Sequence, residues 1–254
     1  MISVIIPTHN RLEELKHALK SVFNQSLLPY EIIVIDDAST CDNQSLIDSF
    51  DVPIIYYRFE TNQGGNLCRN KGVELSIGEY VAFLDDDDTW HEDKLKTQLK
   101  AMIDSNADFC YTGKNIIRVD ENLKEISRRF SFTNPKYKSL QKSIMHKNFI
   151  GTTSSIVVLR DKFLQGGGFD VEMPALQDYE FYLRFIHKGY SVKGIDEGLV
   201  DYFIYQKQSA VSKSLRKNIE ATKKIIDRNK YNKYLSLLLL SLIKITIKKI
   251  LKGY

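Results

Sequence analysis

The chain is poor in cysteine and has no long hydrophobic run. Its 254 residues include three cysteines, Cys41, Cys68 and Cys110, which are widely spaced and form no CxxC pair. This pattern argues against a disulfide framework and against a zinc site, and it favours a reducing cytoplasm. The longest run of apolar or serine residues, 235–243, is much shorter than the roughly 20 residues that span a bilayer. The first ten residues also lack the basic region of a signal peptide.

The net charge of +4 conceals an asymmetry along the chain. Residues 213–254 carry 12 Lys or Arg and 2 Asp or Glu, a net charge of +10, whereas residues 1–212 carry a net charge of −6. The segment 234–254 is also rich in leucine and isoleucine, which suits the surface of an anionic membrane. The alternative is a terminal helix that packs on the core or on a second subunit in a homodimer. The apolar density of this tail argues against nucleic acid as a partner.

The first half of the chain alternates predicted strands and helices. Asn10, with Glu13 three residues later, predicts the N-terminal cap of the first helix. Strands without regular polar alternation are typical of buried parallel sheets, so the order predicts an α/β fold with a doubly wound, mostly parallel sheet. The predicted strands are 2–6, 31–37, 54–59 and 79–84, and the predicted helices are 12–23, 44–50 and 67–75.

Polar clusters follow three of these strands: PTHNR at 7–11, DDAST at 36–40 and DDDD at 85–88. Because ligands of open α/β sheets bind outside the carboxyl ends of the strands, the clusters are expected to line one crevice. Taken singly, the first two are also typical of helix caps and turns. Two carboxylates about 5 Å apart repel by about 3 kcal/mol, so four adjacent aspartates favour a metal site over a solvated loop.

These segments resemble the family 2 glycosyltransferases of the GT-A fold. The chain has ISVIIPTHNR at 2–11, IDDASTCD at 35–42, NQGGNLCRNKGVELSIGEYVAFLDDDD at 62–88 and QDYEFYLR at 177–184. The motifs occur in the order and at the spacing of the family, and the resemblance extends over residues 1 to about 205. It implies that residues 1–110 bind the nucleotide sugar and that 111–212 bind the acceptor in the same GT-A domain. Residues 213–254 would form a basic amphipathic helical tail.

The resemblance assigns residues to a nucleotide-binding pocket. Asp37 corresponds to the position that accepts a hydrogen bond from the N3–H of a uracil-type base, and an ionised carboxylate suits that donor. Pro7, His9 and Arg11 would shape the same base pocket, and His9 stands where the family often has an aromatic residue stacked on the base. A surface helix cap is the alternative for His9.

The DxD signature of the family corresponds to Asp85 and Asp87. By resemblance, Asp87 would bind Mg²⁺ or Mn²⁺ directly, while Asp85 and Asp86 would reach the ribose or the waters of the same metal site. Such an ion neutralises the aspartates and the charge on the departing nucleoside diphosphate. Asn66 and Arg69 lie on a helix turn that faces the nucleotide in relatives, although an exposed helix arginine is the alternative for Arg69.

Asp178 corresponds to the family's catalytic base, which takes the proton of the acceptor hydroxyl as it attacks the anomeric carbon. It begins a predicted amphipathic helix with Tyr182 on the apolar face. Gln177 and Tyr182 replace an acidic residue and a tryptophan that are common at these positions. The alternatives are a helix N-cap for Asp178 and core packing for Trp90, the residue that closes the aspartate motif.

The rest of the chain is assigned less directly. The segment 148–170 resembles the region that helps line the acceptor cleft in relatives, with Gly166–Gly168 as a flexible turn. Residues 113–147 match no family motif and are expected to form an acceptor-side lid. The family often has a histidine near position 208, where this chain has Lys207 and Gln208.

The predicted function is an inverting glycosyltransferase. A nucleoside-diphosphate sugar, UDP-linked by resemblance, is attacked by a hydroxyl of a glycan or lipid-linked acceptor at the inner face of the cell membrane. A sugar-nucleotide pyrophosphorylase would carry a Gly-rich, basic loop near its start, which is missing here, and a processive synthase would carry several membrane spans. The remaining alternative is a non-catalytic GT-A-like scaffold or glycan-binding partner, which the presence of Asp85, Asp87 and Asp178 argues against.

Overall fold

The computed structural model describes residues 1–120, 122, 124–205, 215–230 and 232–251. Its strands are β1 (Ile2–Thr8), β2 (Glu31–Asp36), β3 (Ile54–Arg58), β4 (Tyr80–Phe83), β5 (Asp88–Trp90), β6 (Phe109–Val119), β7 (Glu125–Ser131), β8 (Ile156–Leu159) and β9 (Val192–Tyr205). Its helices are α1 (Leu12–Phe23), α2 (Asn43–Asp48), α3 (Gly65–Leu75), α4 (Lys94–Ser105), α5 (Leu140–His146), α6 (Arg160–Gln165), α7 (Gln177–His187), α8 (Leu215–Asn229) and α9 (Leu235–Leu251), with a 3₁₀ turn at Thr153–Ser155.

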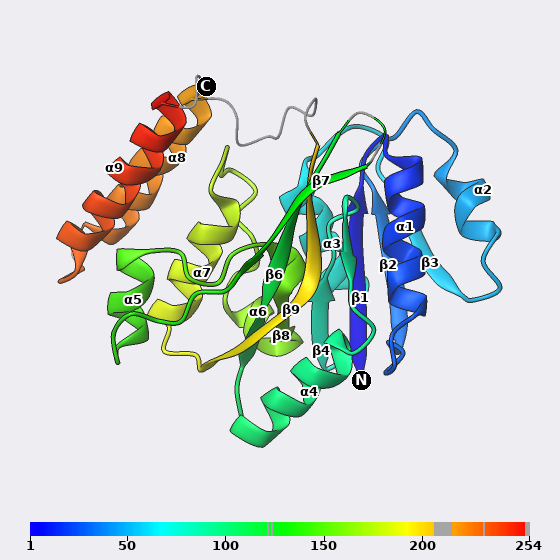
Figure 1. The fold of residues 1–254 in the computed structure, drawn as a ribbon, viewed down its shortest axis with the longest axis horizontal. Coiled ribbons are helices and arrows are strands. Elements are labelled where there is room, and N and C mark those ends of the chain that lie inside the picture. The colour runs from blue at the N-terminus through cyan, green and yellow to red at the C-terminus, as the bar shows by residue number, and fades with distance from the viewer. Residues whose placement is uncertain (121, 123, 206–214, 231, 252–254) are drawn as a thin grey trace.

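One curved sheet runs through the centre of the molecule, with helices on both faces (Figure 1). The strand order is β3-β2-β1-β4-β8-β6-β9-β5, and β7 pairs with β6 at the side. The first four strands of that order are mutually parallel. β8 then enters antiparallel to both β4 and β6, which joins the N-terminal parallel half to the second half of the chain. The α/β fold and the four N-terminal strands agree with the prediction from the sequence.

The continuous apolar strands fill two cores because successive side chains of a strand point to opposite faces of the sheet. Val4 and Ile6 of β1 pack with Leu15 and Leu19 of α1 in one core. Ile5 points to the other face, into a core that includes residues of α3, α5, α6 and α7. Both faces are therefore covered, which explains why these strands show no polar alternation.

The start of α1 differs from the prediction. Asn10 does not cap this helix: its backbone is left-handed (φ 54°) and the N-cap position is Arg11, which makes no side-chain capping bond. The Asn10 Oδ1 instead accepts hydrogen bonds from the backbone N–H of Thr40 (2.7 Å) and from its hydroxyl (2.9 Å). The Asn10 side chain thus binds Thr40, 30 residues away, and this contact connects the β1–α1 turn to the loop after β2.

The second half of the chain extends the sheet. Of residues 113–147, those that the structure describes include most of β6, all of β7 and α5, so this region belongs to the body of the fold. Trp90 is 5% exposed, and its Nε1 donates to the backbone oxygen of Ser154 (2.9 Å). The core-packing alternative for Trp90 is thus confirmed.

The C-terminal helices α8 and α9 lie side by side against the edge of the molecule formed by α5 and α7 (Figure 1). Ala221, Ile225, Leu238 and Leu242 are buried and belong to the same core as α7. The alternative in which the tail packs on the chain's own core is therefore confirmed for one face of these helices. Among the described residues, no helix is long and apolar enough to cross a membrane.

Candidate functional site

The three polar clusters meet at one edge of the sheet, as predicted. β1 pairs in parallel with both β2 and β4, so the residues that follow these strands leave the sheet at the same edge. His9 Nδ1 lies 2.7 Å from the backbone oxygen of Asp37, which joins the first cluster to the second. Arg11 contacts Asp86 and Asp87, which joins the first cluster to the third.

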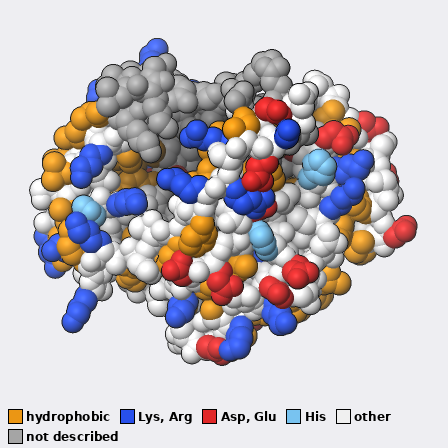
Figure 2. Space-filling view, in the orientation of Figure 1, with side chains coloured by type: hydrophobic (Ala, Val, Ile, Leu, Met, Phe, Trp, Pro, Cys, Tyr) orange, Lys and Arg blue, Asp and Glu red, His pale blue; other side chains and the backbone are white. Residues whose placement is uncertain are grey.

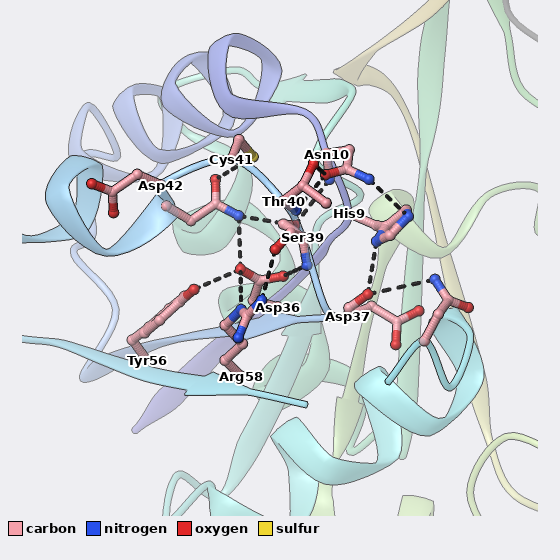
Figure 3. Close-up of polar contacts among 12 residues, drawn as sticks. His9, Asn10, Asp36, Asp37, Ser39, Thr40, Cys41, Asp42, Tyr56 and Arg58 are labelled. Atoms are coloured by element: carbon pink, nitrogen blue, oxygen red, sulfur yellow. Dashed lines mark hydrogen bonds and ion pairs between the residues drawn. The ribbon is translucent and has the colours of Figure 1, made fainter. Parts of the chain in front are cut away.

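The DDAST turn after β2 is fixed by its first aspartate (Figure 3). Asp36 is fully buried, and its carboxylate accepts hydrogen bonds from the Ser39 backbone N–H (2.8 Å), Asn43 Nδ2 (2.9 Å) and the Tyr56 hydroxyl (2.6 Å). Burial would raise the pKa of Asp36, but the hydrogen bonds from Ser39, Tyr56 and Asn43 outweigh it and lower the pKa. Asp36 therefore shapes the turn and is not free to bind a ligand.

The second aspartate of the turn holds the opposite loop. The carboxylate of Asp37 accepts hydrogen bonds from the backbone N–H groups of Gln63 (2.6 Å) and Gly64 (2.9 Å), just before α3. A carboxylate offers about four lone-pair sites, so these two bonds leave capacity for one more donor. His9 is exposed beside it, and Figure 3 shows both residues on the side of the turn away from Tyr56. Pro7 is buried within β1 opposite Ile35, two residues before His9.

Two arginines offset much of the charge of the aspartate run. Arg11 Nη1 lies 2.8 Å from both Asp86 Oδ1 and Asp87 Oδ2. Burial opposes the charged form of Arg11, but the two carboxylates outweigh it and raise the pKa of Arg11. Arg69 of α3 forms an ion pair with Asp85 through Nη2. Arg69 thus belongs to the residues around Asp85–Asp88, a region that includes a cavity lined by Asp86, Asp87 and Asp88 and that is named the cleft. The alternative of an exposed helix arginine is wrong because its side chain is only 15% exposed.

The floor of the cleft consists of hydroxyl groups that the sequence did not single out. Thr153 donates to both oxygens of Asp85 (3.1 and 2.9 Å), and Ser154 donates to Asp88 Oδ2 (2.5 Å). Asp88 Oδ1 is buried without a hydrogen-bond partner among the described residues. Burial, with Asp85 and Asp87 nearby, raises the pKa of Asp88 well above its ordinary 3.8. The run of four hydroxyl residues at 152–155 was the only sign of this floor in the sequence.

A lysine of β6 also reaches the cleft. Lys114 Nζ lies 4.2 Å from the centre of the Tyr202 ring, in a cation–π contact. The register of β6 against β9 shifts next to Lys114, and such irregularities re-aim side chains near functional sites. Burial lowers the pKa of Lys114, while Asp88, Asp178 and Asp85 oppose that effect. Lys114 therefore brings a positive charge close to these three carboxylates.

Asp178 lies in the first turn of α7, close enough to Lys114, Arg69 and Asp85 to interact with their charges. The helix begins at Gln177 and its N-cap position is Leu176, so the N-cap alternative for Asp178 is wrong. Its Oδ1 accepts a hydrogen bond from the Tyr179 backbone N–H (2.7 Å). Burial raises the pKa of Asp178, opposed by that hydrogen bond and by the charges of Lys114 and Arg69. Tyr182, one turn later, is buried against Phe109, as expected for the apolar face.

Asn66 makes a contact that the sequence did not predict. Its Nδ2 donates to the backbone oxygen of Asp170 (2.6 Å), so its amide holds the loop before α7. Gly167 and Gly168 in that loop have positive φ angles (86° and 60°), which favour glycine. Lys207 and Gln208, near the position where the family often has a histidine, lie outside the described residues.

The aspartates suit a hard divalent cation in their chemistry. Mg²⁺ and Mn²⁺ prefer oxygen ligands, and Mg²⁺ is commonly held by one or two carboxylates together with substrate phosphates. Asp87 is 25% exposed and Asp85 is 23% exposed, so both carboxylates are accessible from the cleft. No group of three or more His, Cys, Asp or Glu within the described ranges is arranged to hold a metal alone. The arrangement fits an ion that needs a ligand such as a diphosphate to complete its coordination.

Comparison with protein families finds a match to the model of glycosyl transferase family 2 over residues 3–167. An uncharacterized glycosyltransferase of Haemophilus influenzae is 30% identical over 84% of this chain and 71% of its own length. The putative teichuronic acid biosynthesis glycosyltransferase TuaG of Bacillus subtilis is 28% identical over 80% of this chain and 78% of its own length.

Among solved structures, residues 1–349 of S. aureus TarS in complex with UDP-GlcNAc have a similar fold, with a TM-score of 0.66 and 20% identity. The match covers 89% of this chain and 65% of that chain. Against the longer TarS crystal structure, the match covers 39% of that chain. At this identity the likeness shows the fold, which is GT-A.

Proposed function

The chain belongs to glycosyl transferase family 2, and from this premise we propose that it transfers a sugar from a UDP-linked donor to a hydroxyl group, with inversion at the anomeric carbon. The proposal rests on three groups that lie together beyond the carboxyl ends of β1, β2 and β4. They are a base-pocket carboxylate (Asp37), a phosphate-side carboxylate cluster (Asp85–Asp87) and a carboxylate on a separate helix (Asp178).

The uracil base would bind between His9 and Asp37. Two backbone N–H groups already fix the Asp37 carboxylate, so it is oriented before the ligand arrives. The N3–H of uracil is a donor that a carboxylate accepts, whereas N3 of cytosine is an acceptor that a carboxylate repels. The binding of UDP-GlcNAc by TarS, which shares this fold, supports UDP as the nucleotide.

We expect Asp37→Asn to weaken UDP binding by about 10- to 100-fold, since hydrogen bonds to charged groups contribute about 1.5–3 kcal/mol. The preference for UDP over CDP should shrink as well, because an amide can present a donor to cytosine. Isothermal titration calorimetry with both nucleotides measures the two effects. Asp104→Asn removes an exposed carboxylate of α4 and serves as the control. Unchanged UDP affinity in Asp37→Asn would mean that the base binds at another place in the protein.

Asp87 and Asp85 would hold the divalent cation on the phosphate side. When bound, Mg²⁺ or Mn²⁺ would neutralise charge on the departing UDP. Arg11 and Arg69, which pair with the aspartates here, remain beside the diphosphate and add further positive charge. Their planar guanidinium groups match phosphate oxygens well. The donor phosphates would therefore lie between the DxD residues and these two arginines.

Asp178 would act as the general base. A carboxylate with a raised pKa is a stronger proton acceptor, and it must be ionised to work. It would take the proton of the acceptor hydroxyl as that oxygen attacks the anomeric carbon and the bond to UDP breaks. A single in-line displacement of this kind inverts the configuration of the anomeric carbon.

A glycan or lipid-linked acceptor in polysaccharide synthesis fits the relatives of this chain. TuaG is named for teichuronic acid biosynthesis, and WcaA of Escherichia coli, 30% identical over 73% of this chain, for colanic acid biosynthesis. Both names describe putative biosynthetic glycosyltransferases. A lipid-linked acceptor lies in a membrane, so the outer face of the tail would bring the enzyme close to it.

The outer face of α9 carries apolar side chains that the core does not cover. Leu240, Ile243 and Ile247 are 56, 52 and 49% exposed and recur at the spacing of one helix face. Lys233 and Lys244 are exposed nearby, and no Asp or Glu occurs after residue 227. Figure 2 shows hydrophobic and basic side chains along the upper left edge, where α9 lies in Figure 1. This face would lie on an anionic leaflet and keep the enzyme peripheral at the membrane.

We expect the double variant Leu240→Asn/Ile243→Asn to lose at least tenfold in binding to phosphatidylglycerol vesicles, because each buried apolar side chain contributes about 1.5–3 kcal/mol. Vesicle flotation measures this, and Ile103→Asn on α4, at a similarly exposed position, is the control. Truncation is a poor test because Leu238 and Leu242 are core residues. Equal flotation of all three proteins would reject the membrane face, and loss of a dimer in the double variant would assign it to a second subunit.

A further inference from the structure

The loop between α6 and α7 is held from three sides. From α7, Arg184 donates to the backbone oxygens of Gly166 and Gly168. From α3, Asn70 forms two hydrogen bonds with the backbone of Phe169 (2.7 and 2.9 Å), next to the Asn66 contact with Asp170. The loop therefore joins the helix of Arg69 to the helix of Asp178.

The third side belongs to the C-terminal tail. Arg228 in the last turn of α8 binds Asp170 of the loop through Nη2 (2.5 Å) and Glu180 of α7 through Nη1 (2.9 Å). Lys224, one turn earlier, donates to the backbone oxygen of Glu172 (2.8 Å). One guanidinium thus bridges the loop and the helix that carries the proposed base.

Glu180 is placed where this bridge can affect the active site. It follows Asp178 by two residues, in the first turn of α7, and its side chain is only 4% exposed. A buried carboxylate that is paired on two sides has a fixed position, and Glu180 is bound by both Arg184 and Arg228. The turn that carries Asp178 is therefore fixed in part by a residue from outside the 3–167 family match.

We propose that Arg228 is a positioning residue for glycosyl transfer: it ties the tail to Asp170 and Glu180 and so sets the placement of Asp178 relative to the donor-binding helix α3. The inference rests on the proposed role of Asp178 as the base. It gives the tail a catalytic consequence that is separate from any contact of α9 with a membrane. Arg228 itself touches neither substrate nor the reacting atoms.

Removal of Arg228 should leave the protein folded. Glu180 keeps its second partner, Arg184, with bonds of 3.0 Å to each carboxylate oxygen. Asp170 is 17% exposed and still accepts the Glu172 backbone N–H (2.8 Å). Neither carboxylate is left buried and unpaired, which is the situation that makes such deletions strongly destabilising.

The test compares Arg228→Gln with Arg228→Lys and with Lys223→Gln, which removes one positive charge from an exposed position of the same helix. Hydrolysis of UDP-GlcNAc, UDP-glucose and UDP-galactose in the presence of Mn²⁺ gives kcat and KM, and calorimetry gives the Kd of UDP. Amide hydrogen exchange of the peptide covering 176–182 reports the order of the first turn of α7. Asp170→Asn weakens the same bridge from its other end.

We expect Arg228→Gln to lower kcat about 10- to 100-fold, since a misplacement of about 1 Å is sufficient for such a loss. The KM of the UDP-sugar and the Kd of UDP should stay unchanged, exchange at 176–182 should become faster, and Asp170→Asn should behave alike. Arg228→Lys should recover part of the rate, and Lys223→Gln should match the wild type. A general loss of stability would change the melting temperature without this split between kcat and binding.

Two results overturn the inference. Unchanged exchange at 176–182 in Arg228→Gln means that the bridge does not order the turn, whatever the rates are. Faster exchange with an unchanged kcat means that the order of the turn does not matter for the reaction. The proposed function has its own test in the same assay: full hydrolysis by Asp178→Asn would remove the base assignment, whereas an inactive Asp178→Asn with a fully active Arg228→Gln would reject the positioning role alone.

Discussion

Asp178→Asn is expected to lower kcat for sugar transfer by about 10²- to 10⁴-fold, the usual contribution of a general base. The amide cannot take the proton of the attacking hydroxyl. Its oxygen can still accept the Tyr179 backbone N–H, so the start of α7 should keep its conformation. Steady-state kinetics of UDP-sugar hydrolysis or transfer measures the loss, and calorimetry should show the same Kd for UDP as in the wild type.

The pH dependence of the same reaction is an independent test of Asp178 as the base. The base works as the carboxylate, so kcat/KM should fall as the pH is lowered through the pKa of Asp178. Burial raises that pKa above the ordinary 3.8, which places the fall at a higher pH than for an exposed aspartate. The Asp178→Asn variant should lack this limb. If Asp178→Asn keeps both the rate and the fall at low pH, the base is another residue.

The second large effect is expected for Asp87→Asn. Loss of the carboxylate would remove the most exposed oxygen ligand of the aspartate cluster, so Mn²⁺ should no longer strengthen UDP-sugar binding. We expect the Mn²⁺-dependent gain in donor affinity to fall at least tenfold and sugar transfer to fall at least 100-fold, because the departing UDP loses its counter-charge. Titrations of a UDP-sugar in the presence of Mn²⁺ and in the presence of EDTA separate the metal-dependent part of the donor affinity from the metal-independent part.

The control for Asp87→Asn is Asp104→Asn, which removes an exposed carboxylate of α4 that is outside the aspartate motif. Arg11 keeps its contact with Asp86 in the Asp87 variant, so the pocket should stay intact. Equal donor affinity with Mn²⁺ and with EDTA in the wild-type protein would contradict the metal assignment.

The sheet and the position of the cleft could be predicted because they depend on patterns that are local in sequence. Continuous apolar runs identify β1 to β4, and parallel pairing of these strands places His9, Asp37 and the aspartates at one edge. Ligands of open α/β sheets bind beyond the carboxyl ends of the strands, so the order of the elements was enough to predict where the site lies.

The partners of the site residues could not be predicted, because they come from distant parts of the chain. Arg11 lies 75 residues before Asp86, and Thr153 lies 68 residues after Asp85, so no local pattern links them. The same holds for Asn10, which sequence rules assign to a helix cap but which binds Thr40 in the structure. In each case a tertiary partner outcompetes the local one.

The last helix of the tail has one buried face and one exposed apolar face. Composition predicted an apolar, basic segment, but it gave no means of choosing between core and membrane. The structure shows that Leu238 and Leu242 enter the core, while Leu240 and Ile243 remain on the outer face. The bridge from Arg228 to Asp170 and Glu180 depends on that docking, so it could not be foreseen from the sequence.

The most direct test of the account is calorimetric titration of the wild-type protein with UDP-, GDP-, CMP- and dTDP-linked sugars, each with and without Mn²⁺. We expect binding of a UDP-sugar that is strengthened by Mn²⁺ and is clearly tighter than that of the GDP- and CMP-sugars. Absence of binding by every nucleotide sugar under both conditions would contradict it and would leave a GT-A scaffold without transferase activity.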